Sequence, residues 1–402
     1  MLDRPVYLDN HATTRTDPRV VEAMLPFFTT HYGNAASVGH RFGWEAAEAL
    51  EHARAQVAAL LNAEPRAILF TSGATEANNL ALKGVIPFLK SKGNHLITAA
   101  TEHRAVLDPL KRLSREGYEL TIVPTGADGL VDPESIAAAF SARTVLVSIM
   151  AANNEVGTIN PVVEIGRLCR SRGIVFHTDA TQAVGKIPLD SAELGADLIS
   201  LSAHKFHGPK GIGALYVRRE GLPVRLSPLF DGGGQERGLR SGTVPIPLAV
   251  GFGEAAEIAG RERGEESQRI ARLRNRLHDR LAKRLDGLKL NGHPTKRLPG
   301  NLHLSFAGVD GQALLMALKN VAVSAGAACG SAEGGPSHVL TALGLDEFMA
   351  RASLRFGLGR FTTEEEVDFA ANEVAEVVLR LRERSSAAFS RKRNVLGIDA
   401  AL

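Results

Sequence analysis

The chain has 402 residues, which is too long for one ordinary hydrophobic core and is typical of two or three domains. Hydrophobic residues make up 44% and charged residues 23% of it, as in water-soluble globular proteins. Because 47 Lys and Arg stand against 44 Asp and Glu, the net charge of +3 argues against a protein that binds nucleic acid or an anionic membrane.

Cysteine content and the first residues favour a cytoplasmic location. Two cysteines in so long a chain are typical of a reducing compartment and not of a disulfide framework. The opening residues, MLDRPVYLDNHATT, lack the basic flank and apolar core of a signal peptide. No apolar run approaches the ~18–20 residues that span a membrane, so we expect no membrane association.

The first half of the chain predicts an α/β domain. A helix is expected before the sheet, where Leu50, Ala53, Val57, Leu60 and Leu61 recur at helical spacing. Between about 65 and 220, apolar runs alternate with helical patterns, which predicts a mostly parallel seven-stranded sheet covered by helices. The predicted strands are 67–70, 95–100, 119–124, 144–150, 174–180, 198–203 and 213–217. Only a short loop joins the last two, so they should pair antiparallel or lie at a break in the pattern.

After about residue 245 the pattern changes to a smaller α+β unit. Ile270, Leu273, Leu277 and Leu281 form one stripe of a long charged helix, and strands are predicted at 301–306 and 352–358. The last predicted helix, 361–381, has a Thr-x-x-Glu capping signal before its apolar stripe. We therefore expect a large α/β domain over 15–260 and a small α+β domain made of 1–14 and 261–402.

Polar side chains follow five of the predicted strands. In an open α/β sheet, ligands bind beyond the carboxyl ends of the strands. Loop polarity explains any single case, but five together favour a binding site at this edge. The residues concerned include Thr75, Glu102, His103, Asn153, Asn154, Asp179, Gln182, His204 and Lys205.

Two glycine-rich stretches are candidates for binding an anion. In TSGATEANN (71–79), Gly73 and Ala74 make a tight turn from strand to helix, with Thr75 near the helix N-terminus. Backbone N–H groups and the helix dipole at such a turn suit a phosphate group, although ordinary helix caps look similar. GGGQERGLRSGT (232–243) adds Arg240, Ser241 and Thr243.

Asp179 and Lys205 narrow the ligand class. Asp179 lies in an apolar strand, where its carboxylate needs a cationic partner: an arginine of the protein or a protonated ring nitrogen of a ligand. A loop lysine is usually a solvated charge, but Lys205 follows a buried strand, where loss of hydration lowers the pKa of an amine and makes it nucleophilic toward a carbonyl. A phosphate site, a buried carboxylate and an activated lysine together match pyridoxal phosphate.

A zinc site is the weaker alternative. His177, Asp179, His204 and His207 could be imagined as ligands, but the first two lie on a strand and the others on a loop. Neither a cysteine pair nor a His-Glu-x-x-His motif supports it, and no metal is expected to belong to the protein itself.

The two cysteines have different surroundings. Cys169 lies among Val162, Ile165 and Leu168 at helical spacing, which indicates core packing. Cys329 lies in VSAGAACGSAEGGPSHVL, a run of small residues that cannot form a rigid apolar wall, so we interpret it as an accessible reactive thiol. Arg355, in ASLRFGLGR, is a candidate for binding a substrate carboxylate through two hydrogen bonds.

The chain resembles the cysteine desulfurases, members of the class V aminotransferase family of pyridoxal-phosphate enzymes. The resemblance covers nearly the whole chain in order, and it is closest to the housekeeping type that supplies iron–sulfur cluster assembly, judged by the long loop around Cys329. Its motifs are YLDNHATT, GNAASVGHRFGWEA, FTSGATEANNLALKG, TEHRAVL, NNEVGTINP, HTDATQAVGK, SAHKFHGPKGIGALYVRR, GGGQERGLRSGT, SAGAACGS and LRFGLGRFTTEEE.

The resemblance implies a fold-type I pyridoxal-phosphate transferase and a role for each matching residue. Lys205 holds the cofactor aldehyde and later moves protons, and His103 stacks on the ring and assists as acid and base. Asp179 pairs with the ring nitrogen, Gln182 contacts the ring hydroxyl, and Asn154 and Arg355 hold the substrate carboxylate. The implied cofactor-binding set, phosphate ligands included, is Ala74, Thr75, His103, Asn154, Asp179, Gln182, Ser202, Ala203, His204, Lys205 and, from the other subunit of a homodimer, Thr243.

The implied reaction converts L-cysteine to L-alanine. Cys329 takes the sulfur as a persulfide, delivers it to an iron–sulfur scaffold or other acceptor, and is a candidate transient iron–sulfur ligand shared with the scaffold. The alternatives are a selenocysteine lyase or cysteine sulfinate desulfinase of the same family and, less favoured, a non-catalytic assembly platform. The chain departs from the family at SVGH, where an arginine is frequent, at Gly330, where threonine is frequent, and at its C-terminal GIDAAL.

Overall fold

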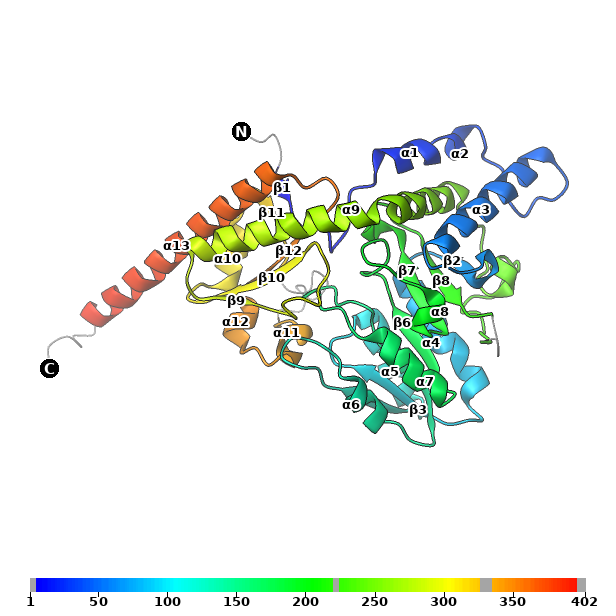
Figure 1. Cartoon of the computed structure of the whole chain (residues 1–402), viewed down its shortest axis with the longest axis horizontal. Coiled ribbons are helices and arrows are strands. Elements are labelled where there is room, and N and C mark those ends of the chain that lie inside the picture. The colour runs from blue at the N-terminus through cyan, green and yellow to red at the C-terminus, as the bar shows by residue number, and fades with distance from the viewer. Residues whose placement is uncertain (1–4, 220–223, 326–334, 396–402) are drawn as a thin grey trace.

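The computed structural model describes residues 5–219, 224–325 and 335–395, with side chains up to residue 384. A sheet covered by helices occupies one end of the molecule and a smaller unit the other, and the helix α9 (Ile246–Arg284) runs along both (Figure 1). None of the helices in these ranges combines the length and the apolar composition that a membrane span requires.

The large sheet has seven strands in the order β2-β8-β7-β6-β5-β3-β4. Neighbouring strands pair in parallel, except that β8 is antiparallel to both β2 and β7. All seven predicted strands form, and the antiparallel pairing predicted for the last two is confirmed. The strands are β2 (Ile68–Thr71), β3 (His95–Ala99), β4 (Glu119–Val123), β5 (Thr144–Ser148), β6 (Val175–Asp179), β7 (Leu198–Ser202) and β8 (Gly213–Val217).

Both faces of this sheet are buried, because neighbouring side chains of a strand point to opposite faces. On β2, Ile68 and Phe70 pack into the core that also contains residues of α3, α7 and α9. Leu69 points the other way, into a core formed with α4 and α5. The helices of this half are α1 (Pro18–Met24), α2 (Pro26–Thr29), α3 (Arg41–Ala59), α4 (Ala74–Leu89), α5 (Arg104–Arg115), α6 (Pro133–Ala138), α7 (Val162–Ser171) and α8 (Ser191–Leu194).

The smaller unit is built on a three-stranded antiparallel sheet in the order β12-β10-β9 and a two-stranded parallel sheet of β1 and β11. Its core contains Val6 and Leu8 from the N-terminal segment together with Ile270, Leu273, Leu277 and Leu281 of α9. Its elements are β1 (Val6–Tyr7), β9 (Leu288–Leu290), β10 (Asn301–Phe306), α10 (Gly311–Ala317), β11 (Val321–Ala322), α11 (His338–Ala342), α12 (Glu347–Arg351), β12 (Ser353–Gly357) and α13 (Glu364–Val395).

The helix α9 spans the residue at which we expected the small domain to begin. Its first half, up to Ala259, packs in the core of the large sheet, and its second half packs in the core of the small unit. The predicted capping signal of the last helix is confirmed at Thr363 and Glu366, which exchange hydrogen bonds of 3.0 and 3.2 Å between backbone and side chain. The domain limits at residues 14 and 260 stay a prediction.

Candidate active site

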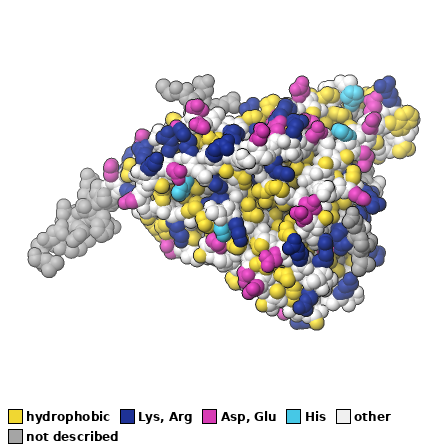
Figure 2. Space-filling model, viewed as in Figure 1, with side chains coloured by type: hydrophobic (Ala, Val, Ile, Leu, Met, Phe, Trp, Pro, Cys, Tyr) yellow, Lys and Arg dark blue, Asp and Glu magenta, His cyan; other side chains and the backbone are white. Residues whose placement is uncertain are grey.

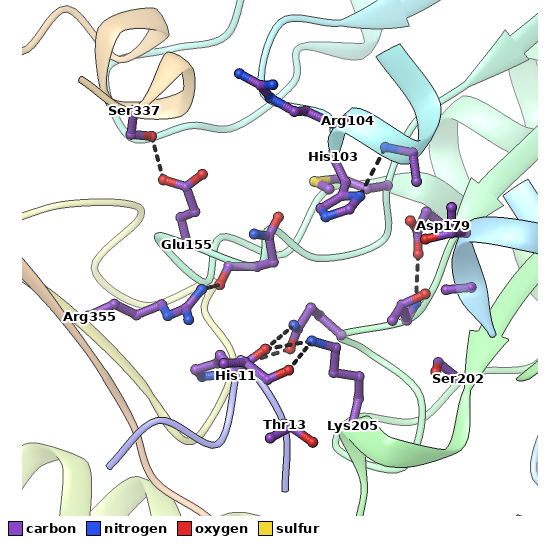
Figure 3. A pocket seen from close by; sticks show the side chains of 18 of the residues that line it. His11, Thr13, His103, Arg104, Glu155, Asp179, Ser202, Lys205, Ser337 and Arg355 are labelled. Atoms are coloured by element: carbon purple, nitrogen blue, oxygen red, sulfur yellow. Dashed lines mark hydrogen bonds between the residues drawn. The ribbon is translucent and has the colours of Figure 1, made fainter. Parts of the chain in front are cut away.

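A cavity of about 1110 Å³ opens at the carboxyl edge of the large sheet, where it meets the small unit. Figure 3 shows side chains from distant parts of the sequence around it: Thr13, His103, Asp179, Lys205 and Arg355. Ten predicted site residues line this cavity together: Ala74, Thr75, His103, Asn154, Asp179, Gln182, Ser202, His204, Lys205 and Arg355.

Three other predicted site residues are placed differently. Ala203 is fully buried beneath the cavity and is not part of its lining. Thr243 is exposed to solvent and does not line the cavity of its own chain. Cys329 lies outside the described residues, but Ala325 and Gly335, on either side of that segment, both line the cavity.

Asp179 ends β6 with its carboxylate at the cavity, 6% exposed. One oxygen, Oδ2, accepts a hydrogen bond of 2.8 Å from Asn78 Nδ2, and Oδ1 accepts one of 2.9 Å from the backbone N–H of Thr181. Neither donor is an arginine, so the internal ion pair considered from the sequence does not account for this carboxylate. Two neutral donors hold the group in place and leave its negative charge for a cationic ligand atom.

Lys205 ends the short 3₁₀ helix η2 (Ala203–Lys205), directly after β7. Its Nζ donates hydrogen bonds to the carbonyl oxygens of His11 at 2.8 Å and Ala12 at 2.7 Å. These residues precede it by more than 190 positions, so the N-terminal segment holds the amine inside the cavity. His204 contributes to the same contact, since its Nδ1 lies 3.0 Å from Thr13 Oγ1.

The N-terminus of α4 forms an anion site on the cavity wall. Its N-cap residue is Gly73, which has no side chain to cap the helix, so the first N–H groups at Ala74 and Thr75 face the cavity. Gly213 of β8 packs against Gly73, because a Cβ at position 213 would come within 2.7 Å of the Gly73 backbone. Arg240, a predicted anion ligand, instead pairs with Glu76 of α4 at 2.9 Å.

His103 is the N-cap residue of α5, and its ring lies in the cavity (Figure 3). Burial lowers its pKa, and the nearby Lys205 lowers it further while Asp179 opposes this. The Nδ1 atom accepts a hydrogen bond of 3.0 Å from the backbone N–H of Ala105, so the neutral ring carries its proton on Nε2. His103 is therefore neutral at physiological pH, with a defined proton position.

The loop that carries Asn154 is held by three consecutive contacts with the small unit. Arg355 Nη1 donates to the carbonyl oxygen of Asn154 at 3.0 Å, Asn301 Nδ2 to that of Glu155 at 2.9 Å, and Arg297 Nη2 to that of Val156 at 2.9 Å. Arg355 is 2% exposed, also pairs with Asp9 at 3.0 Å, and has an Nε without a hydrogen-bond partner. Arg355 lines the cavity, and its guanidinium keeps one buried N–H, at Nε, without a hydrogen-bond partner.

Glu155 and Ser337 connect this loop to the chain that follows the undescribed segment. Ser337, the N-cap residue of α11, donates from Oγ to the buried carboxylate of Glu155, and both residues line the cavity. The next residue, His338, donates from Nε2 to the carbonyl oxygen of Glu102 at 2.9 Å. Two side-chain contacts therefore fix the chain eight and nine residues after Cys329.

Several residues of the site were not predicted from the sequence. His11 and Thr13 belong to YLDNHATT, which we used for resemblance alone, and Asn78 lies on α4 beside the predicted Thr75. The sequence interpretation did not single out Lys186, whose Nζ donates to Gln182 Oε1 at 2.9 Å. Only its place in the motif HTDATQAVGK, seven residues after Asp179, could have indicated a role.

The histidines considered as zinc ligands have other partners. His177 is fully buried on β6, and its two ring nitrogens contact Ser148 Oγ at 2.8 Å and Ser200 Oγ at 3.0 Å. His207 contacts the carbonyl oxygen of Arg15 and the backbone N–H of Arg360. Across the described ranges, no group of three or more His, Cys, Asp or Glu is arranged to hold a metal ion.

These donor and acceptor groups fit pyridoxal 5'-phosphate. An uncapped helix N-terminus suits its phosphate, the oriented carboxylate of Asp179 suits a protonated ring nitrogen, and the amine of Lys205 suits its aldehyde. All three line one cavity, and the amide of Gln182, 4% exposed, lies beside them.

Known proteins resemble this chain over most of its length. A family model described as "Aminotransferase class-V" matches residues 6–369. A protein named cysteine desulfurase IscS, from Anaeromyxobacter sp. (strain K), is 55% identical over 381 residues, which cover 95% of this chain and 94% of that protein. A solved NifS-like protein superposes with a TM-score of 0.86 at 41% identity over 94% of this chain and 100% of its own. A structure titled "SspA in complex with cysteine" superposes with a TM-score of 0.79 at 36% identity, over 89% of this chain and 99% of its own.

Proposed function

The chain belongs to the class-V aminotransferase family, and on that premise we propose that it is a pyridoxal-phosphate-dependent cysteine desulfurase that converts L-cysteine to L-alanine. The observation that carries this proposal is that Lys205, Asp179 and the N-terminus of α4 line one cavity, to which both ends of the Cys329 segment also belong. When bound, the cofactor supplies an electron sink conjugated with the substrate amine.

The residues of this chain bind and orient the substrate. Arg355, whose Nε has no hydrogen-bond partner, and Asn154 line the cavity and are the proposed ligands of the L-cysteine carboxylate. Ala74, Thr75, Ser202 and His204, which line the cavity, would hold the cofactor phosphate, and Gln182 would contact its ring hydroxyl. Lys205, held by the carbonyl oxygens of His11 and Ala12, provides an amine that accepts and returns protons. His103 exchanges a proton at Nε2.

Cys329 is the proposed sulfur acceptor. Its thiol takes the sulfur atom of L-cysteine, so the C–S bond of the substrate breaks, an S–S bond forms on Cys329, and the substrate carbon gains a proton. L-cysteine and the Cys329 thiol thus become L-alanine and a Cys329 persulfide, without an external oxidant or reductant. The described residues on either side of the Cys329 segment, Ala325 and Gly335, line the cavity, which supports this role.

The test compares Cys329→Ala with Cys169→Ala in the purified holoenzyme. Cys329→Ala should keep the visible absorption of the bound cofactor near roughly 390–420 nm, the range expected of this family, and lose sulfide release. Cys169→Ala should retain both, because Cys169 is fully buried in the core. Undiminished sulfide production by Cys329→Ala would reject Cys329 as the sulfur acceptor. A purified wild-type protein without visible absorption would favour the alternative that the protein is a non-catalytic assembly platform.

A selenocysteine lyase or cysteine sulfinate desulfinase is the alternative within the family. Those reactions need no thiol on the protein, so Cys329→Ala would retain turnover of selenocysteine or cysteine sulfinate. Under the proposed function, wild-type turnover of L-cysteine depends on Cys329. Comparing the three substrates in both proteins separates these activities.

We further propose that the enzyme works as a homodimer. Large apolar side chains are exposed on α1, α2, the start of α3 and the residues that join these helices, and Figure 2 shows hydrophobic atoms at that end of the molecule. A patch of this kind is typical of a protein interface, and Thr243, exposed in its own chain, is available to a partner. The exposed residues are Val21, Leu25, Phe28, Tyr32, Val38, Phe42 and Trp44.

Light scattering after size exclusion tests this assembly. The wild type should elute as a dimer, and Phe28→Glu combined with Trp44→Glu should shift it to a monomer with weakened cofactor retention. A monomeric wild type contradicts the proposal.

We propose iron–sulfur scaffold proteins and other thiol acceptors in the cytoplasm as recipients of the persulfide sulfur. The small number of cysteines, two, is in keeping with the cytoplasm, and the name of the 55% identical relative is in keeping with these acceptors.

A further inference from the structure

A second lysine, Lys186, lies behind Lys205. Both line a small internal cavity of about 30 Å³, which also contains His11 and the glutamate Glu266 of α9. The backbone of Lys186 is fixed to α9, because Ser267 Oγ donates to its carbonyl oxygen at 2.7 Å. Its Nζ donates to Gln182 Oε1 at 2.9 Å. Nothing in the proposed reaction uses this amine, yet it contacts a residue of the cofactor site.

The contacts of Gln182 determine which end of its amide is oxygen. A lysine Nζ donates to carbonyl and amide oxygens, so the amide atom it contacts is Oε1. A backbone carbonyl only accepts, so the amide atom 2.9 Å from the His11 carbonyl oxygen is Nε2. Both neighbours require the same orientation. The usual ambiguity between the two ends of a glutamine amide is therefore removed by chemistry.

His11 adds a third constraint. Its Nδ1 lies 3.0 Å from the same Gln182 Oε1, so Nδ1 carries the proton and donates it. Burial lowers the pKa of His11 well below its usual value, and the nearby Lys186 lowers it further, so the ring stays neutral. Gln182 Oε1 thus accepts two hydrogen bonds, from Lys186 and His11, and has no capacity left for a ligand.

We propose that Lys186 is a positioning residue that holds the Gln182 amide with its oxygen turned away from the cavity and one N–H available to the cofactor. This inference rests on the proposed function, because it concerns the ring hydroxyl that Gln182 would contact in the bound cofactor. An N–H donor there stabilises the oxygen as an anion, whereas an amide oxygen would repel it. A more stable anion lowers the pKa of the bound chromophore.

The groups around Lys186 favour its neutral form. Burial, together with the positive charges of Lys205 and Arg355, lowers the pKa of Lys186 to about 7, and Glu266 opposes this shift. His207, which also lines the small cavity, has its pKa lowered by burial to about 4. A neutral lysine amine still donates a hydrogen bond, so the amide orientation is kept whether Lys186 is charged or not.

The experiment is a double-mutant cycle on the visible pH titration of the holoenzyme without substrate. Lys186→Met and Gln182→Leu should each raise the apparent pKa of the bound chromophore, by about one unit. The double variant should match Gln182→Leu alone, because Lys186 acts through Gln182. Lys186→Arg, which keeps a donor, should restore most of the wild-type curve.

Additive shifts in the double variant would overturn the proposal, since they would mean that Lys186 acts by its charge alone. An unchanged titration in Lys186→Met would overturn it as well. If Lys186→Met does not fold, Lys186→Gln, too short to reach Gln182 in the same way, replaces it in the cycle. A wild-type protein that binds no cofactor refutes the proposed function itself, before the cycle is measured.

Discussion

Arg355 and Asn154 contact each other directly at the wall of the cavity: the guanidinium Nη1 of Arg355 on β12 donates to the carbonyl oxygen of Asn154 at 3.0 Å. The two proposed carboxylate ligands are therefore joined directly, and the small sheet fixes the loop that carries Asn154 at the edge of the large sheet. Asn301 and Arg297 extend this contact to the next two carbonyl oxygens. A change at Arg355 should consequently affect binding and architecture together.

Arg355→Lys should separate these effects. Lysine keeps the positive charge but lacks the planar, forked guanidinium that can pair with a carboxylate through two parallel hydrogen bonds, so kcat/KM for L-cysteine should fall roughly 10- to 100-fold. The change should appear mainly in KM, because the reacting groups are intact. Steady-state kinetics measures it, with Arg276→Lys as the control, since Arg276 pairs with Asp368 on the surface of α9. Unaltered kinetics in Arg355→Lys would exclude the carboxylate role.

Asp179→Asn should retain a folded protein with little activity. Asparagine has the size of aspartate but no charge, so the protonated form of the ring nitrogen loses its partner and turnover should fall roughly 100-fold or more. Alanine formation and the visible spectrum measure this. Asp310→Asn makes the same chemical change at the exposed N-cap of α10, at the rim of the same cavity, and should leave activity near that of the wild type.

The two thiols should differ in reactivity. Burial raises the pKa of Cys169 to about 12, and it lies in the core on α7, so it should not react in the native protein. A chromogenic disulfide reagent at about pH 8 should therefore titrate one thiol per chain, and none in Cys329→Ala. Both should react in denaturant. Rapid native labelling of Cys329→Ala would show that Cys169 is accessible after all.

Glu236 and Glu51 bind the same arginine but should differ in their effect on stability. Arg54 donates to Glu236 at 2.7 and 2.8 Å with both side chains almost fully buried, whereas Glu51 is a largely exposed partner at 3.0 Å. Glu236→Ala leaves a buried cation and should lower the free energy of unfolding by about 3–5 kcal/mol. Glu51→Ala should cost less than about 1 kcal/mol. Urea denaturation of both variants tests the difference, and equal losses would contradict it.

Acid should destabilise the protein through its buried histidines. Burial lowers the pKa of His177 to about 4, while in the unfolded chain it is about 6.5. Between about pH 6.5 and pH 4, His177 is protonated in the unfolded state but not in the folded state. The free energy of unfolding therefore falls as pH decreases through this range. His177 alone should contribute on the order of 3 kcal/mol to this loss. In urea unfolding of the apoprotein at several pH values, His177→Gln should show a shallower decline, and parallel curves would be inconsistent with this origin.

Much of the architecture was predictable from local pattern. Strands buried on both faces appear as continuous apolar runs, so all seven strands of the large sheet were found within one or two residues of their ends. Because parallel strands present their carboxyl ends at one edge, the same pattern predicts that His103, Asp179 and Lys205 lie together, as they do around the cavity. The residue types then indicate the cofactor.

Only the tertiary structure brought the distant segments to this edge. No sequence pattern indicates that the carbonyl oxygens of His11 and Ala12 accept hydrogen bonds from Lys205, or that Lys186 donates to Gln182. Nor does any pattern indicate that Arg355, Asn301 and Arg297 donate to three successive carbonyl oxygens. These contacts join residues whose separation in the chain follows no helical or strand period. Local periodicity reports which face of an element is buried, whereas the partner across the interface is decided by how whole elements pack.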